Sequence, residues 1–225
     1  MDLLGRRCTP SAFAAVACFV LAIWTLSLLR FEHVLHAAQF AANPRRVADG
    51  KLWYLLTSAL IATHPVFLSL ASFALFALGA LVVCGPRIFW ASTLVGHVAA
   101  TVMTYLVLGL ARAVEPTAYA GLVTQLDYGV STMQATWLGA VAATLWLTQA
   151  QTVPRRASIA AGCAAIGLIA YLARPDLTLL DTDHGFAFLI GITLITTTLR
   201  HHARPRRAIA TSSNAWTTSR APTPE

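Results

Sequence analysis

Charged residues are scarce in this chain. Only 11% of its 225 residues are Asp, Glu, Lys or Arg, whereas 57% are hydrophobic, and the mean hydropathy is +0.65. About a quarter of the residues of a typical soluble domain are charged, so this chain has too few charges to cover a water-exposed surface. The scarcity argues against a soluble enzyme, a disordered chain and a nucleic-acid-binding protein, in spite of the net charge of +7.

The few charges are clustered, which leaves six runs of at least sixteen residues without any Asp, Glu, Lys or Arg. About twenty helical residues cross the hydrocarbon of a bilayer. Barrel strands would show alternating polar and apolar residues, and the runs lack this alternation. The runs therefore predict an all-α membrane protein with several spans. The six predicted spans are 11–29, 65–83, 89–111, 130–150, 157–173 and 184–199.

These spans define a membrane domain over 11–200, after a short N-terminal segment, 1–10. A tail rich in Ser, Thr, Pro and Arg follows at 201–225, and we expect it to be disordered because it has little to bury. The first apolar run is longer than that of a signal peptide, which predicts an uncleaved anchor. A long connection, about 30–64, joins the first two spans. The four cysteines fall in spans or on the predicted cytoplasmic side, so no disulfide is expected.

The distribution of charge predicts the orientation of the chain. If the N-terminus is cytoplasmic, ten of the sixteen basic residues lie in cytoplasmic segments, in agreement with the positive-inside rule. All acidic residues except Asp2 and Glu225 then lie outside. The sequence thus predicts a multi-pass protein of the cell membrane with both termini in the cytoplasm. The lipid bilayer is an expected partner, and nucleic acid is not.

Polar residues within spans, or at their rims, are costly and indicate candidate functional sites. Ser131 and His184 begin the fourth and sixth spans, which run in the same direction, so they lie at the same depth near the outer face. Histidine can take the proton of a serine and later return it to a leaving amine. The positive end of the fourth helix would favour an oxyanion beside Ser131. The other unusual polar residues are His64, His97, Thr132 and Gln134.

Structural explanations stay open for these residues. Ser131, with Asp127 four residues earlier, could cap the fourth span, and His184 could be an interfacial histidine beside its helix cap. His97 is more simply explained by a hydrogen bond between helices. His33 and His36 form an HxxH pair without a third ligand at a recognisable spacing. No metal or other cofactor is therefore expected.

Three stretches of the chain resemble the rhomboid intramembrane serine proteases and their inactive relatives. Residues 50–60, GKLWYLLTSAL, are similar to a loop segment of that family that ends in an LLTSAF-like run. Gly129-Val-Ser131, followed by Gly139-Ala140, is similar to the GxSG motif and its later LGA. Gly191 lies seven residues after His184, which is similar to the interval between the family's catalytic histidine and a small residue of its final helix. The resemblance extends over about 53–199, in the family's order.

The resemblance implies a six-helix rhomboid-like bundle with a catalytic dyad of Ser131 and His184. Gly129, the backbone of Ser131 and, if the loop is reshaped, His64 would support the oxyanion. Four small residues would let the fourth and sixth spans approach closely: Gly139, Gly185, Ala187 and Gly191. The implied partners are transmembrane segments of other membrane proteins. They would be single-span substrates cleaved near the outer face.

The chain also departs from the family pattern. Thr132 replaces the last glycine of the motif, and an ungapped match places Phe67 and Ala71 where the family has a histidine and an asparagine that hold the oxyanion. Losing one such donor costs on the order of 10²–10³ in rate. Two hypotheses therefore remain, a divergent protease and an inactive rhomboid-like pseudoprotease that binds transmembrane helices of client proteins. A small transporter would need a functional His97 or a broken helix at mid-membrane.

Overall fold

The structure is a computed structural model that describes residues 8–62, 65–148 and 178–217. This part of the chain is helical and contains no strand, apart from an isolated bridge between Ala42 and Asp127. Helices predominate because the uncharged runs satisfy their backbone hydrogen bonds internally. The longer helices are α1 (Pro10–Phe31), α4 (Val66–Cys84), α6 (His97–Val114), α7 (Ser131–Thr148) and α9 (Leu179–Thr217). The shorter ones are η1 (Ala37–Gln39), α2 (Pro44–Ala48), α3 (Tyr54–Thr57), η2 (Ser58–Leu60), α5 (Pro86–Ala91), η3 (Ser92–Gly96) and η4 (Gly121–Val123).

Four helical segments of the described part are long and apolar enough to cross a membrane. They are Pro10–Phe31, Val66–Cys84, Pro86–Val114 and Leu179–Leu199. The prediction of a helical chain with several candidate membrane spans is thus confirmed, whereas the count of six spans is not. Helix α7 does not belong to this group, and the predicted fifth span, 157–173, lies outside the described residues.

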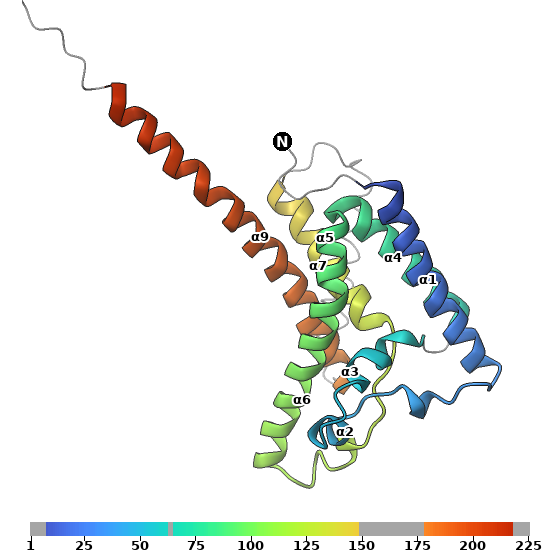
Figure 1. Ribbon diagram of the computed structural model, residues 1–225. Helices are drawn as coiled ribbons and strands as arrows, with labels where there is room; N and C mark the ends of the chain where they lie inside the picture. Colours follow the sequence, from blue (N-terminus) through green and yellow to red (C-terminus); the bar gives the residue numbers. More distant parts are fainter. Residues whose placement is uncertain (1–7, 63–64, 149–177, 218–225) are drawn as a thin grey trace, which may run out of the picture.

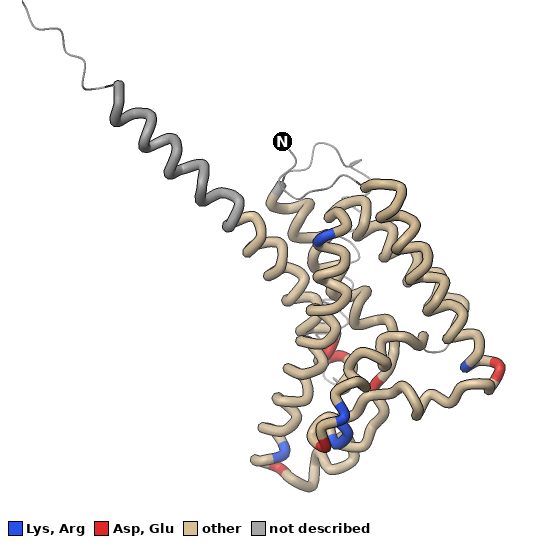
Figure 2. Tube along the Cα trace, viewed as in Figure 1, with Lys and Arg blue, Asp and Glu red and all other residues tan. Residues whose placement is uncertain are grey.

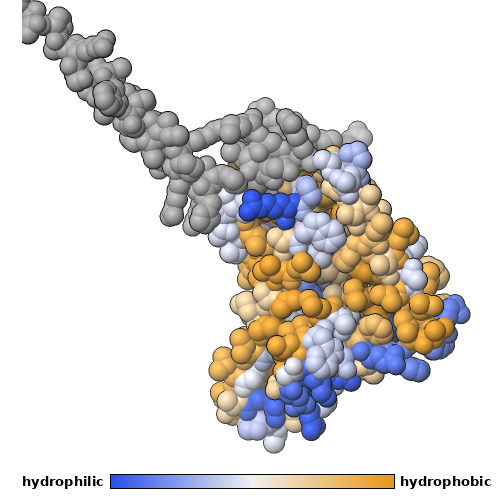
Figure 3. Space-filling view, viewed as in Figure 1, coloured by the Kyte–Doolittle hydropathy of each residue, from blue (hydrophilic) through white to orange (hydrophobic). Residues whose placement is uncertain are grey.

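Helix α7 lies among the other helices of the bundle. It packs against α4, α6, η3 and α9, so much of its surface faces protein and it can carry polar side chains. Thr132, Thr136 and Thr144 are all buried on it. Large apolar side chains are exposed on the neighbouring helices, including Leu75 of α4 and Leu110 of α6, and also near the end of α7, at Trp146. Figure 3 shows hydrophobic residues over the middle of the visible face and hydrophilic ones at the end that carries α2.

Aromatic packing fixes α7 within the bundle. Trp137 is fully buried, and its ring lies 5.2 Å from that of Phe73 on α4 and 5.0 Å from that of Phe89 on α5. Its indole N–H donates to Thr93 Oγ1 at 3.1 Å, so the polar atom of the ring is satisfied. One side chain thereby joins three helical segments.

The third predicted span is not one uniform α-helix. Helices α5 and α6 are joined by η3, a turn of π-helix, and such turns are frequent at functional sites. A Cβ on Gly96 in this turn would lie 2.2 Å from Thr136 Cγ2, so glycine lets α7 pack against it. The sequence predicts no break here, because neither Pro nor charge interrupts the run.

The two ends of the bundle differ (Figure 1). The start of α1 and the turn between α4 and α5 lie at one end, and α2, α3 and the start of α9 lie at the other. Most charged residues of the described part gather at the second end (Figure 2). There the connection after α1 pairs with the one before α7: the N–H groups of Ala42 and Asp127 donate to each other's carbonyls at 2.9 and 2.8 Å.

Helix α9 is longer than predicted at both ends. It begins at Leu179 rather than at 184, because Thr178 and Asp181 form a capping arrangement: the Thr178 N–H donates to Asp181 Oδ2 at 2.8 Å, and the Asp181 N–H to Thr178 Oγ1 at 3.3 Å. The helix continues to Thr217, past the predicted end of the sixth span at 199.

Candidate active site

Ser131 and His184 are in direct contact. The Nε2 atom of His184 lies 2.8 Å from Oγ of Ser131, at hydrogen-bonding distance. Ser131 is the first residue of α7, and His184 lies in the second turn of α9. Both residues are half-buried. The structure therefore brings together the two residues that the sequence selects as a nucleophile and its base.

Two glycines make this approach possible. A Cβ on Gly139 would lie 2.1 Å from the carbonyl oxygen of Phe188, and a Cβ on Gly191 would lie 2.1 Å from that of Thr136. Both contacts are with backbone, which a rotamer change does not relieve, so α7 and α9 pack at a distance that only glycine permits. Ala187 is fully buried in the same region and clusters with Ala100 and Ala135. Gly185 directly follows His184 and is half-buried.

The start of α7 presents backbone N–H groups near Ser131. The N–H of Gln134 donates to the carbonyl of Val130 at 3.2 Å, which is the first turn of the helix. The N–H groups before Gln134, including that of Ser131, have no partner within the helix. Together with the helix dipole they favour a negative charge at this position.

Gly129 has a different role from the one that the resemblance implies. Its backbone lies at φ +139°, which L-residues rarely adopt, and its N–H donates to the Ser58 carbonyl at 3.0 Å. The N–H therefore holds the turn before Ser131 and is not available for an oxyanion. His64, the other residue assigned to this role, lies outside the described residues.

Ser58 also binds His97. The buried Nε2 atom of His97 lies 3.2 Å from Ser58 Oγ, so the partner of this histidine comes from the long first connection and not from another spanning helix. Ser58 thus joins α6 to the turn that carries Gly129. Only the LLTSAL run indicates in the sequence that this serine matters, and nothing there indicates its partners.

Thr132 is bonded to the residue that precedes His184. Its hydroxyl donates to Oδ2 of Asp183, and the Thr104 hydroxyl lies 3.5 Å from Oδ1 of the same carboxyl. The sequence places Asp183 before the sixth span, whereas in the structure it belongs to α9 and only 1% of its surface is exposed. Its burial is possible because hydroxyls on α6 and α7 supply the hydrogen bonds that a buried carboxyl needs. Thr132, which stands in place of the motif's last glycine, therefore acts as a hydrogen-bond donor.

The residues of α4 that meet α7 are not Phe67 and Ala71, the two positions that the ungapped match with the rhomboid pattern assigns to the oxyanion. Phe67 is 63% exposed and Ala71 is exposed as well, and the Phe67 ring lies 6.0 Å from that of Phe31 at the end of α1. Ser72 reaches α7 instead: its Oγ accepts from Nε2 of Gln134 at 3.0 Å. Phe67 and Ala71 therefore contribute no donor to the dyad.

The end of α1 holds the two segments that lead into α4 and α7. Arg30 donates to the carbonyl of Ala62 at 2.7 Å and lies 3.3 Å from the hydroxyl of Tyr128, and its guanidinium stacks 4.8 Å above the Tyr128 ring. The N–H of Ala62 donates to Ser27 Oγ at 2.9 Å. The sequence identifies Arg30 only as a basic residue of the first connection, because its partners are 32 and 98 residues away.

Asp127 does not serve in the structure as the cap that the sequence allows. Its Oδ2 accepts from the hydroxyl of Tyr105 at 3.0 Å, which ties the connection before α7 to α6. Burial raises the pKa of the Asp127 carboxyl, and the Tyr105 hydrogen bond opposes this shift. Asp127 therefore joins the connection before α7 to α6 and does not act as the helix cap that the sequence allows.

Among the described residues, no cluster of three or more His, Cys, Asp or Glu side chains could hold a metal ion. No family model, curated protein or solved structure matches this chain.

Proposed function

We propose that this chain is a rhomboid-like intramembrane serine protease that cleaves single-span membrane proteins near the outer membrane face. The observation that carries the proposal is the 2.8 Å contact between Ser131 Oγ and His184 Nε2. The six-span bundle and the cytoplasmic placement of both termini belong to the same proposal. It requires no cofactor.

In the proposed reaction, Ser131 Oγ attacks the carbonyl carbon of a peptide bond while Nε2 of His184 takes its proton. The same nitrogen then returns the proton to the departing amine, which leaves an acyl-enzyme that water hydrolyses. The oxyanion would form beside the first N–H groups of α7, where the helix dipole stabilises negative charge. The contact of Thr132 with Asp183 supports this chemistry by fixing the residues next to each member of the dyad.

The test is labelling of the purified protein in lipid by a fluorophosphonate, which reacts only with an activated serine. We expect labelling of the wild type and its loss in both Ser131→Ala and His184→Ala. Ser11→Ala, an exposed serine in the first turn of α1, is the matched control and should label normally. Labelling that persists in Ser131→Ala would refute the assignment of the nucleophile.

A second candidate is the inactive pseudoprotease, which would bind transmembrane helices of client proteins without cutting them. The exposed positions of Phe67 and Ala71 favour it, because neither supplies a donor to the oxyanion, and the Gly129 N–H is already bonded. In this case the Ser131–His184 bond only joins two helices. This candidate predicts no labelling of a folded wild type, and cross-linking to a co-reconstituted single-span protein that Ser131→Ala leaves unchanged.

A further inference from the structure

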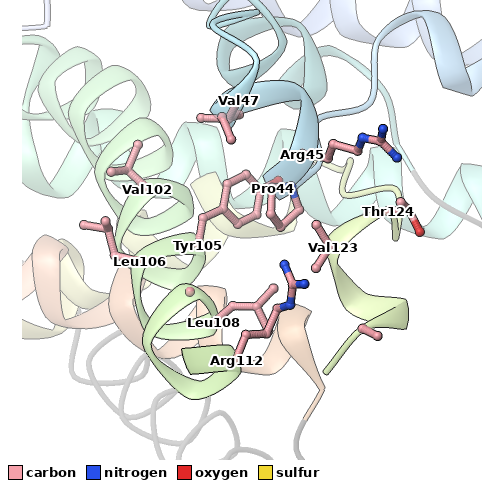
Figure 4. A pocket seen from close by; sticks show the side chains of 13 residues that line it. Pro44, Arg45, Val47, Val102, Tyr105, Leu106, Leu108, Arg112, Val123 and Thr124 are labelled. Atoms are coloured by element: carbon pink, nitrogen blue, oxygen red, sulfur yellow. The ribbon is translucent and has the colours of Figure 1, made fainter. Parts of the chain in front are cut away.

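A cavity of about 680 Å³ lies between α2, α6 and the connection that contains η4. Figure 4 shows that side chains from all three segments point into it. It is separate from the dyad, since neither Ser131 nor His184 lines it. Apolar side chains form much of its wall: Val47, Val102, Leu106, Leu108 and Val123.

Two arginines border this apolar cavity. Arg45 belongs to α2 and is exposed, and Arg112 lies in the last turn of α6. In Figure 4 the guanidinium of Arg112 extends from α6 toward Val123. Its Nε atom is buried and has no hydrogen-bond partner among the described residues. A buried donor of this kind favours an anionic ligand, because an unpaired polar group away from water is costly.

The cavity lies at the end of a candidate membrane span. That span, Pro86–Val114, ends two residues after Arg112, so the guanidinium lies where lipid head groups meet the hydrocarbon. Leu106 lines the cavity and is 63% exposed, and Leu110, one turn later, is 71% exposed. The apolar wall of the cavity is therefore continuous with the surface of α6 that would face acyl chains.

We propose that this cavity binds an anionic phospholipid, with the phosphate at Arg45 and Arg112 and an acyl chain along Leu106 and Leu110. The charge of the two arginines matches the head group, and basic side chains at the ends of spans attract anionic lipids. The apolar wall and the exposed leucines match the hydrocarbon. A soluble anion would satisfy the arginines but would leave this apolar surface uncovered.

The test uses the full chain in phosphatidylcholine nanodiscs that contain increasing fractions of phosphatidylglycerol. In the wild type, phosphatidylglycerol should raise the thermal unfolding midpoint and remain bound in native mass spectrometry. The double variant Arg45→Gln/Arg112→Gln should bind it at least about tenfold more weakly, since each basic residue contributes measurably to lipid attraction. Arg87→Gln removes an exposed arginine from α5, at the other end of the same span, and should behave like the wild type.

Three results would overturn the proposal. One is a wild type that retains phosphatidylglycerol no better than phosphatidylcholine, a result that does not depend on the folding of any variant. Another is an equal loss of binding in Arg87→Gln and in the double variant, which would indicate general surface charge. Soluble glycerol phosphate is the competitor: if millimolar concentrations displace the lipid, the site recognises the phosphate alone and the lipid assignment is wrong.

Discussion

Replacing Gly191 by alanine is predicted to separate Ser131 from His184. The added Cβ would lie 2.1 Å from the Thr136 carbonyl oxygen and 2.8 Å from the Ala140 nitrogen. Both atoms belong to the backbone of α7, so the side chains cannot relieve the clash by changing rotamer. Helix α9 has to move away from α7 instead.

The size of that movement follows from ordinary contact distances. A carbon and a carbonyl oxygen approach to about 3.3 Å, so the helices must separate by roughly 1 Å at this point. The 2.8 Å contact between the dyad atoms would then lengthen to roughly 4 Å, beyond hydrogen-bonding range. A misplacement of about 1 Å can reduce reactivity by about 10²-fold.

The effect on stability should be smaller than the effect on reactivity. Overpacking costs about 1–3 kcal/mol, but alanine is favoured over glycine within a helix by about 1 kcal/mol. The two terms oppose each other, so the unfolding midpoint should fall only modestly. Loss of fluorophosphonate labelling with most of the fold retained is therefore the expected signature.

Gly79→Ala on α4 is the matched control, because a Cβ there would meet no atom within 4 Å. This variant should label at the wild-type rate and unfold at the same temperature or slightly above it. The rate of labelling and the thermal midpoint should be measured for all three proteins in the same lipid. If Gly191→Ala labels as fast as the wild type, the close packing of α7 and α9 does not position the dyad, and the reasoning is refuted.

Two further predictions concern the residues around the dyad. Thr132→Val should lower the free energy of unfolding by about 1–3 kcal/mol, because it removes a hydroxyl from the buried Asp183 carboxyl; Thr132→Ser keeps the hydroxyl and should lose less in the same unfolding assay. The unfolding midpoint of the wild type should fall as pH rises from about 4, the ordinary aspartate pKa, because burial raises the pKa of Asp127 and the folded state then holds its proton longer. Asp127→Asn should show a shallower slope than the wild type; a slope equal to that of the wild type would refute the contribution of Asp127.

The general character of the fold is predictable from the sequence because it depends on composition. Uncharged runs identify α1 and α4 to within two residues of their observed ends. The start of α9 is not predicted in this way, because Asp181 and Asp183 look like water-exposed residues outside a span. They are buried instead, since hydroxyl donors lie nearby on segments that are remote in the sequence.

The candidate site is predictable where a short motif carries it and not where partners are distant. Depth arguments place Ser131 and His184 at one level, and the structure places them in contact. The sequence does not predict which face of α4 meets α7, because an ungapped match sets the position of a residue along the chain but not the rotation of its helix. A difference of one residue, from Ala71 to Ser72, turns the side chain by 100°. Arg30 has no local signal, since its partners lie in two other segments.

The Thr132–Asp183 hydrogen bond gives a structural role to the threonine that replaces the last glycine of the GxSG pattern. Thr132 follows Ser131 on α7, and Asp183 precedes His184 on α9, so the hydrogen bond joins the neighbours of the two dyad residues. Turning either helix by one residue would break this bond and the dyad contact together. The polar pair and the glycine contacts therefore specify the same relative position of α7 and α9. Positioning of the dyad thus does not require the glycine that Thr132 replaces, and the proposed proteolysis depends instead on the N–H groups at the start of α7, which would have to hold the oxyanion.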